Sequence, residues 1–370
     1  MTSKIKIDLP FFISVVILAL AGFLIFNSAS LGLLTGNGAT YGSVTWNQTF
    51  FGLFLGTIAL LITARIPYTF YKTYAFYIFL ATIIATLLVF VPHIGFAHGG
   101  AKRWLSIGSF SLQPSEFLKI GYAIYFSAWM ATAKDKVKTF SKGFLPFLLI
   151  TAVVGAILLK QPDTDTFLVA MCGGLAIFIA AGGRWRYIVA TGLIAIVGIG
   201  IIALARPYVM SRITTFMHPQ SDALGSGYQI QQSMIALGSG GLYGRGYGQS
   251  IQKFNFLPEP IGDSIFAVAG EEFGFIGTTL LILFFVFFAL RGLTIARDAK
   301  DTFGRLLAVG IVILIISQAF INIGAMSNIL PLSGIPLPFV SHGGTSLLIT
   351  LAEVGIMLNI SKGMKKEKKV

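Results

Sequence analysis

The chain has 370 residues, of which 55% are hydrophobic and 11% are charged, and its formal net charge is +13. A soluble domain carries about one quarter charged residues, so this composition excludes an ordinary soluble protein and indicates an integral membrane protein. The basic residues cluster in short loops between apolar segments, which argues against nucleic acid as a partner. The single cysteine, Cys172, lies in an apolar segment and excludes a disulfide framework and a cysteine-based metal site.

Apolar segments long enough to cross a bilayer follow one another along the whole chain. One crossing needs about 20 apolar residues, and on this basis we predict an all-α polytopic membrane protein with about ten transmembrane helices. The first segment lacks the cleavage pattern of a signal peptide, so we interpret it as a retained helix. The predicted helices cover residues 9–31, 48–64, 70–91, 114–132, 143–159, 165–182, a seventh segment ending near 205, 263–290, 306–327 and 345–360.

The distribution of the basic residues predicts the orientation of the chain. Most of the 27 lysines and arginines fall in the loops that share a side with the N-terminus, and the positive-inside rule places that side and both termini in the cytoplasm. Residues 206–262 then form a large outer loop between helices seven and eight, and residues 362–370 form a basic cytoplasmic tail. No repeat or linker divides the chain, so we predict a single domain over residues 1–370.

Ionisable side chains gather in three segments that this orientation places on the outer side. Glu116 and Lys119 are three residues apart and share one helix face, so they form a structural ion pair or, as ionisable residues in a membrane often do, a functional site that meets an anionic ligand. In KQPDTDT, we interpret Asp165 as a helix cap. Asp163 either caps the same helix, holds a cation or orients a basic partner such as Lys160.

The third segment runs from residue 206 to residue 277. Ile230, Met234 and Leu237 recur at helical spacing, which predicts a short amphipathic helix lying in the membrane interface. We interpret the glycine run at 238–248 as flexible backbone, since it lacks the lysine of a nucleotide-binding loop. The charged residues of this segment are Arg206, Arg212, Asp222, Arg245, Lys253, Glu259, Asp263, Glu271 and Glu272.

Among these acids, Asp263 stands at the start of the predicted eighth helix, where the simplest interpretation is a helix cap. Glu271 and Glu272 lie about two turns deeper, where ionised carboxylates need partners. The loop PLSGIPLPFVSHGG after the ninth helix is long and apolar, and we predict that it dips back into the outer leaflet, which requires protein or water to cover its backbone. Its His342 is interpreted as a hydrogen-bonding residue.

Three further polar residues lie inside predicted helices. Gln318 and Asn322 are four apart on the ninth helix and are interpreted as contacts between helices. Glu353, in the tenth helix, needs a buried partner that the sequence does not identify.

Five segments occur in order between helices so placed: RWLSIGSFSLQPSEFLK, KQPDTDT, GSGYQIQQSMIALGSGGLYGRGYG, LPEPIGDSIFAVAGEEFGFIG and GIPLPFVSHGGTS. Together they closely resemble the SEDS family of shape, elongation, division and sporulation proteins, and the resemblance covers essentially the whole chain. It is nearer the FtsW form of the family than the RodA form. The chain departs from the family where His-Thr usually precedes the motif aspartate, where tyrosine usually stands at His342, and where QPDLGT has become QPDTDT, which adds Asp165 without a family role.

The resemblance implies a peptidoglycan glycosyltransferase that polymerises lipid II into glycan strands on the outer face of the bacterial cytoplasmic membrane, in division or elongation. It implies a class B penicillin-binding protein and other division or elongation membrane proteins as partners. It also implies that Asp263 is catalytic, and a single carboxylate suits the general base for an acceptor hydroxyl. Candidates for holding substrate pyrophosphate are Glu116, Lys119, Arg206, Arg212, Arg245, Lys253 and a divalent cation such as Mg²⁺ or Mn²⁺, with Asp163, Glu259, Glu271 and Glu272 in support.

Two other functions fit part of the pattern. A lipid II flippase or transporter also has many helices and buried charges, but transporters place their polar sites near the membrane midplane and often contain inverted repeats. Here the polar residues gather on one side and no repeat is visible. A non-enzymatic scaffold for division proteins would not need the outward-facing acids.

Overall fold

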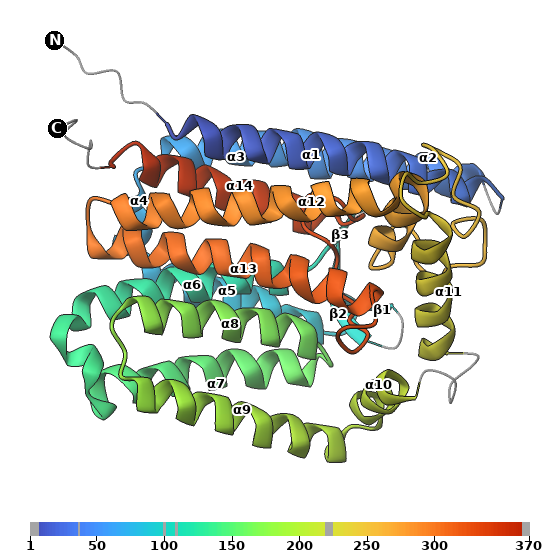
Figure 1. Ribbon diagram of the computed structural model, residues 1–370. Coiled ribbons are helices and arrows are strands. Elements are labelled where there is room, and N and C mark those ends of the chain that lie inside the picture. Colours follow the sequence, from blue (N-terminus) through green and yellow to red (C-terminus); the bar gives the residue numbers. More distant parts are fainter. Residues whose placement is uncertain (1–6, 36–37, 99–100, 108–109, 219–224, 365–370) are drawn as a thin grey trace, which may run out of the picture.

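The computed structural model describes residues 7–35, 38–98, 101–107, 110–218 and 225–364. The long helices lie side by side along one axis (Figure 1). They are α1 (Leu9–Ser30), α3 (Leu55–Arg65), α5 (Ala75–Leu87), α6 (Pro114–Ala133), α7 (Leu145–Lys160), α8 (Thr164–Ala180), α9 (Trp185–Ala205), α12 (Ile265–Asp298), α13 (Thr302–Met326) and α14 (Gly344–Ser361).

Short elements connect these helices. They are the helices α2 (Gly38–Asn47), α4 (Tyr68–Thr73), α10 (Pro207–Met217) and α11 (Ser226–Ser239), the 3-10 turns Leu31–Thr35, Leu88–Phe90 and Lys134–Lys138, and the π turns Gln48–Phe54 and Phe140–Phe144. The strands β1 (Gly95–His98), β2 (Ala101–Ile107) and β3 (Phe110–Leu112) form one antiparallel sheet in that order. Both chain ends lie at one end of the bundle, while α10, α11 and the strands lie at the other (Figure 1).

Hydropathy and length make the chain a multi-pass membrane protein. Within the described residues, seven helical segments are long and apolar enough to cross a membrane: Leu9–Leu34, Tyr41–Arg65, Phe140–Lys160, Trp185–Ala205, Ile265–Asp298, Thr302–Met326 and Gly344–Ser361. Of the other three predicted ranges, two correspond to α6 and α8, whereas residues 70–91 are divided among α4, α5 and the turn Leu88–Phe90. The eighth helix is longer than predicted, because α12 continues to Asp298 through residues that favour helix.

The structure corrects two predicted loops. The segment between α5 and α6 contains the three strands, whose cross-strand pairs include Phe96 with Trp104 and Ser106 with Ser111. Their runs are too short for the period of two to stand out in the sequence. The segment after residue 205 begins with α10, which has Pro207 in its first turn, a position where the missing N–H of proline costs nothing.

The prediction for α11 is partly wrong. The helix is present, but Met234 and Ile235 are exposed, whereas Ile230, Ser233 and Ala236 are buried. Its small buried residues let it pack against α12 and α13, so its inner face is not the apolar stripe that the spacing predicted.

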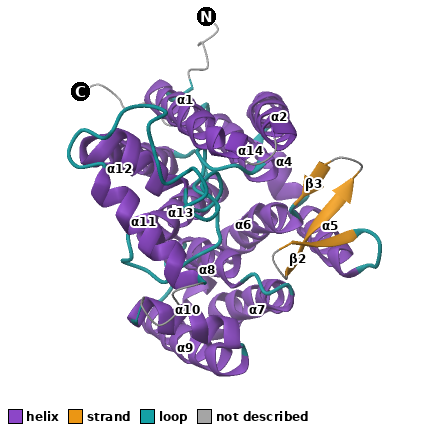
Figure 2. Ribbon diagram, turned by 90° about the vertical axis from the view of Figure 1, so that its right-hand side faces the viewer, coloured by secondary structure: helices purple, strands orange, loops and turns teal. Residues whose placement is uncertain are grey.

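The centre of the bundle is α13, which contacts α6, α8 and α12 (Figures 1 and 2). The helix α9 lies at the outside, with only Tyr187, Thr191 and Ala203 buried among its residues. The loop after α13 runs back among the helices: Leu332, Leu337, Phe339 and Val340 are buried. Its backbone is therefore covered by protein, as the predicted re-entrant loop requires. Of the predicted basic tail, residues 365–370 lie outside the described part of the chain.

Candidate functional site

Asp263 lies in the turn that leads into α12. Ser264, not Asp263, occupies the helix cap, and it makes no side-chain capping bond, so the simplest interpretation of Asp263 as a cap is wrong. Instead, Gln229 Nε2 on α11 donates to Asp263 Oδ1 at 3.2 Å and to Ser264 Oγ at 2.9 Å. The backbone N–H of Asp263 is a second donor to this carboxylate, and both hydrogen bonds favour its ionised form.

Three donors hold the main chain on either side of this carboxylate. His342 N donates to Ile261 O at 2.7 Å, Ser341 Oγ to Gly262 O at 2.6 Å and Asn322 Nδ2 to Asp263 O at 2.8 Å. Asn322 Nδ2 also donates to Ile335 O at 2.9 Å, which ties the loop after α13 to the same turn. The Asp263 turn is thus fixed from α13 and from the re-entrant loop together.

The surroundings of Asp263 change its acidity. Burial, followed by the charge of Glu259, raises the pKa of Asp263 from its ordinary value of 3.8 to about 7. The hydrogen bond from Gln229 and the charge of Arg212 act in the opposite direction and lower this pKa. A carboxyl with a pKa near 7 exchanges protons readily at neutral pH, which suits a general base.

Arg212, on α10, is held beside this turn by Asp165. Its Nη1 lies 2.7 Å from Asp165 Oδ2, and Gly334 N donates to the same oxygen at 3.2 Å. The guanidinium also lies 6.0 Å from the Tyr208 ring centre. Asp165 was predicted to cap α8, but the structure shows that it binds a side chain of another helix.

Asp163 also orients a basic partner, as one interpretation predicted, but that partner is Arg103 of β2. The Arg103 guanidinium donates to Pro162 O and lies 3.7 Å from Asp163 Oδ1, and Ser115 Oγ donates to Asp163 Oδ2 at 3.3 Å. Burial raises the pKa of the Asp163 carboxyl. Lys160 points elsewhere, 5.0 Å from the Phe90 ring centre.

Glu271 and Glu272 bind the loop that precedes α12. Glu271 accepts from Ser250 Oγ at 2.6 Å and from two backbone N–H groups, and Arg245 Nε lies 3.4 Å away. Glu272 accepts from Lys253 Nζ at 2.7 Å and from Ser28 Oγ at 2.6 Å. The partners that these deep carboxylates were predicted to need are therefore supplied by the loop and by α1.

Lys253 is enclosed by its partners. Its ammonium donates to Glu272, Ser28 and the Gly248 carbonyl, and its side chain is 0% exposed. An ammonium has three hydrogens, and all three have protein acceptors here. This geometry gives no support to the prediction that Lys253 contacts pyrophosphate.

The glycine run predicted to be flexible is docked on α12. At Gly274 the helix is broken, with φ 65° and ψ −166°. The loop repairs the break, because Arg245 N and Gly246 N donate to the carbonyls of Glu271 and Glu272 at 2.9 and 3.0 Å. On the other side, the N–H groups of residues 275 and 276 donate to the carbonyls of residues 241 and 242.

The pair on α6 is a buried ion pair. Lys119 Nζ lies 3.0 Å from Glu116 Oε1 and donates to Gln318 Oε1 at 2.6 Å, and both charged side chains are almost inaccessible. Gln318 Nε2 donates in turn to Pro336 O at 3.0 Å. Glu353 on α14 is buried within electrostatic reach of Lys119 and Glu116. The pair therefore supports the re-entrant loop, and Lys119 is the cation whose charge acts on Glu353.

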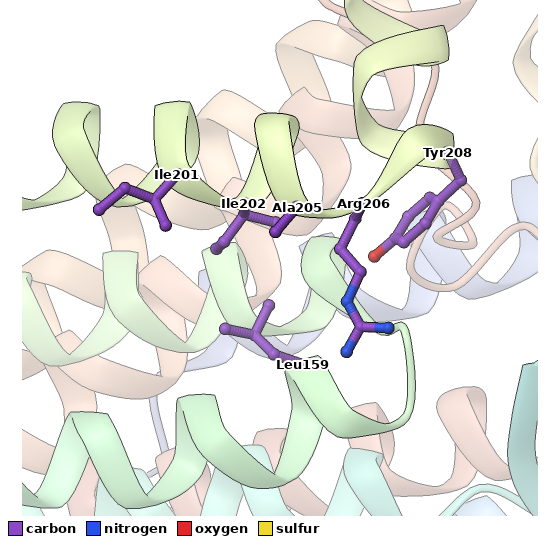
Figure 3. Close-up of a pocket in the computed structure, with 6 residues that line it drawn as sticks. All are labelled: Leu159, Ile201, Ile202, Ala205, Arg206 and Tyr208. Carbon is purple, nitrogen blue, oxygen red and sulfur yellow. The ribbon is translucent and has the colours of Figure 1, made fainter.

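Arg206 lies away from these ion pairs. No described residue forms an ion pair with it, and it borders a pocket of about 190 Å³ that is otherwise lined by Leu159, Ile201, Ile202, Ala205 and Tyr208. Its guanidinium extends from the junction of α9 and α10 toward the end of α7, with the Tyr208 hydroxyl turned toward it (Figure 3). An apolar cavity with one cation at its edge suits a hydrocarbon chain that carries a phosphate.

The described residues contain no group of three or more His, Cys, Asp or Glu side chains placed to hold a metal ion. His342 stacks on Phe26, with ring centres 5.9 Å apart, and burial lowers the pKa of its imidazole. Glu259 is the carboxylate whose charge acts on Asp263. A divalent cation here would depend on substrate phosphates for most of its ligands.

The chain is similar in sequence to known proteins. A family model described as a cell cycle protein, for FtsW, RodA and SpoVE, matches residues 9–366. The chain belongs to this family. As a SEDS protein it is 40% identical over 311 residues to the probable peptidoglycan glycosyltransferase FtsW of Geobacter sp. (strain M18), which covers 84% of this chain and 85% of that protein. It is 37% identical over 370 residues to stage V sporulation protein E of Bacillus subtilis (strain 168), covering 98% of each.

Solved structures share the fold of this SEDS chain. One, from a study of the coordination of polymerization and crosslinking by a peptidoglycan synthase complex, has a TM-score of 0.79 and 23% identity, over 96% of this chain and 98% of that one. The crystal structure of the rod shape determining protein RodA of Thermus thermophilus has a TM-score of 0.72 and 22% identity, over 98% and 99%. The relatives at higher identity carry FtsW and SpoVE names, which agrees with a SEDS protein nearer FtsW.

The SEDS site contains residues that the sequence did not identify. Gln229 was given no role from the sequence, and Asn322 was assigned only to contacts between helices, yet both bind Asp263. Arg103 was placed in a loop with no role. A signal was present for Gln229, because YQIQQS has three glutamines in a helix that packs against others.

Proposed function

We propose that this SEDS protein, a peptidoglycan glycosyltransferase, polymerises lipid II with Asp263 as its general base. The observation that carries this proposal is the buried carboxylate of Asp263: Gln229 donates to its Oδ1, Asn322 ties its turn to the re-entrant loop, and its pKa is about 7. The names of the FtsW relatives support the reaction class. The structural likeness to a chain of a synthase complex that coordinates polymerization and crosslinking supports work beside a crosslinking enzyme, which we infer to be a class B penicillin-binding protein.

The reaction requires one proton transfer and one departing anion. The 4-hydroxyl of the acceptor sugar attacks the anomeric carbon of the donor, and its proton passes to Asp263 Oδ2. The bond from the anomeric carbon to the pyrophosphate oxygen breaks, and the electron pair leaves with the lipid pyrophosphate. Attack opposite the leaving group inverts the anomeric centre in one step. Arg212 stabilises the charge of the departing pyrophosphate.

The basic residues predicted to bind pyrophosphate fall into two groups, according to their contacts within the protein. Arg212 and Arg206 have guanidinium nitrogens without acceptors among the described residues, and we assign them to the pyrophosphate and to the lipid phosphate respectively. Lys119 and Lys253 are neutralised inside the protein, and Arg245 lies against Glu271. A divalent cation, if bound with the pyrophosphate, would draw on Asp263 and on Glu259, whose charge acts on Asp263. We infer a site on the outer face of the bacterial cytoplasmic membrane.

The experiment is polymerisation of lipid II by purified protein, with and without the penicillin-binding partner, and with Mg²⁺, Mn²⁺ or EDTA. We expect Asp263→Asn to lose polymerisation by at least about a hundredfold, the scale of general-base catalysis. Asp298→Asn is the matched control, because Asp298 is an acid paired with Arg297 at the far end of α12. Wild-type polymerisation by folded Asp263→Asn would exclude the proposed role, and lipid transport without polymer would favour a flippase.

A further inference from the structure

Asp165 joins three parts of the chain at the edge of the Asp263 site. It lies in the first turn of α8, and its Oδ2 accepts from Arg212 Nη1 on α10 and from Gly334 N in the loop after α13. That loop also binds the Asp263 turn through Asn322, which bonds to both. The carboxylate therefore fixes the guanidinium relative to the same loop that fixes Asp263.

Arg212 needs such a partner to have a defined position. Its helix, α10, has 11 residues, and Thr215 is the buried one among them. An arginine side chain on so exposed a helix would sample many rotamers, and ordering it on binding would cost conformational entropy. An ion pair that orders the side chain in advance removes this cost from substrate binding.

The ion pair with Asp165 involves only part of the Arg212 guanidinium. Arginine has five N–H donors in a planar fork, and the contact with Asp165 uses Nη1. In the described part of the chain, Nε and Nη2 of Arg212 donate to no other group. The same fork can therefore hold Asp165 on one side and a phosphate on the other.

Arg212 is also the cation whose charge acts on Asp263. Its charge lowers the pKa of Asp263. The side chains of Arg212 and Asp165 are 25% and 15% exposed. Pairs with this much solvent contact contribute little to stability, so stability alone is a poor reason for the contact.

We propose that Asp165 is a positioning residue that presents Arg212 to the pyrophosphate of the substrate. This inference rests on the proposed function, because it assumes that a lipid pyrophosphate binds beside Asp263. The residue touches Arg212 and not the reacting atoms. It gives a role to the acid that distinguishes QPDTDT in this chain.

The experiment compares Asp165→Asn, Asp165→Glu and Arg212→Ala, each measured for kcat, KM for lipid II and thermal unfolding. We expect Asp165→Asn to raise KM about tenfold, the scale of one hydrogen bond to a charged group, with kcat within about twofold. Asp165→Glu should recover most of the change, because it restores the carboxylate. Asp298→Asn, which breaks an exposed ion pair elsewhere, is the control with no change in KM.

The double variant Asp165→Arg with Arg212→Asp exchanges the two residues of the ion pair. It distinguishes a positioning role of Asp165 from a purely structural one. It keeps the ion pair and should unfold near the wild-type temperature, but its KM should stay as high as that of Arg212→Ala. Full recovery of KM by the reversed pair, or an Asp165→Asn variant with unchanged KM, would overturn the inference. Asp263→Asn is run in parallel: its inactivity together with an unchanged KM in Asp165→Asn refutes the positioning role alone, whereas an active Asp263→Asn refutes the proposed function.

Discussion

At the scale of single residues, the acidity of Asp263 is set by a few neighbours from distant parts of the chain. Gln229 is 34 residues away in sequence, yet its amide donates to the carboxylate and to the next hydroxyl. A donor to the ionised form stabilises that form. Gln229 thus offsets part of the effect of burial and of Glu259 on the pKa of Asp263, and it holds Oδ1 in place.

Removal of this donor should shift the pH dependence of the reaction. We expect Gln229→Ala to raise the pKa of Asp263 above about 7, so that kcat/KM falls more at about pH 6 than at about pH 8. The sign follows from the role of the base: below its pKa the carboxyl is protonated and cannot accept a proton. The measurement is a pH profile of polymerisation, with the exposed Gln249→Ala as control. An equal loss at every pH would show that Gln229 acts on structure and not on ionisation.

The sequence could identify Asp263, and it named Arg212 and Glu259 as candidates, but it did not identify the hydrogen-bond donors of Asp263. The resemblance to SEDS proteins identified the aspartate by its motif, whereas Gln229 and Asn322 come from other helices and meet it through the fold. The sequence also did not show which charged residues form ion pairs inside the protein. Lys253 looks like a free cation in sequence, and nothing in its own segment indicates that Glu272 and Ser28 would surround it.

At the scale of elements, glycines allow the outer loop to lie against α12. A side chain at Gly274 would place Cβ 2.3 Å from Gly244 N, and one at Gly244 would place Cβ 2.1 Å from Glu272 O. Both glycines also have positive φ, which other residues adopt at a cost. The run of glycines therefore indicates close packing here, although the same composition in an isolated segment is typical of flexible backbone.

Gly274→Ala should destabilise the protein by more than a change in helix propensity alone would explain. We expect the loss of about 2 kcal/mol or more from the strained backbone and the contact with Gly244, seen as a lower unfolding temperature in detergent. Gly198→Ala in α9 is the matched control, because nothing lies within 4 Å of its added Cβ. That variant should be neutral or more stable, since alanine favours helix by up to about 1 kcal/mol. Equal effects of the two changes would contradict the docked loop.

At the scale of the whole molecule, the two ends of the bundle differ in chemistry. The end where α1 begins and α14 ends carries the short basic loops, and the opposite end carries α10, α11 and the turn that leads into α12 (Figure 1). The apolar segments and the charge of their loops predicted this arrangement well, because each depends on local composition. The strands, α10 and the inner face of α11 depend on contacts between segments, and composition did not predict them.

The inferred orientation can be measured on intact cells. In a Cys172→Ala background, a cysteine at Tyr243, which is 80% exposed, should react with a membrane-impermeant maleimide added outside spheroplasts. A cysteine at Lys136 should react after the membrane is permeabilised, because its basic loop belongs to the cytoplasmic side. Labelling of Lys136→Cys from outside, with Tyr243→Cys protected, would reverse the orientation.

The break at Gly274 also decides how α12 can enter the bilayer. An acidic residue near the middle of an inserting helix costs on the order of 3 kcal/mol, and an unbroken helix would carry Glu271 and Glu272 in with it. The continuous part from Phe275 to Asp298 has about 24 residues and a length of about 36 Å, enough to cross the hydrocarbon core alone. Residues 245–253 contain groups that neutralise the two glutamates, and they are synthesised before them. These groups are therefore available when Glu271 and Glu272 reach the membrane surface.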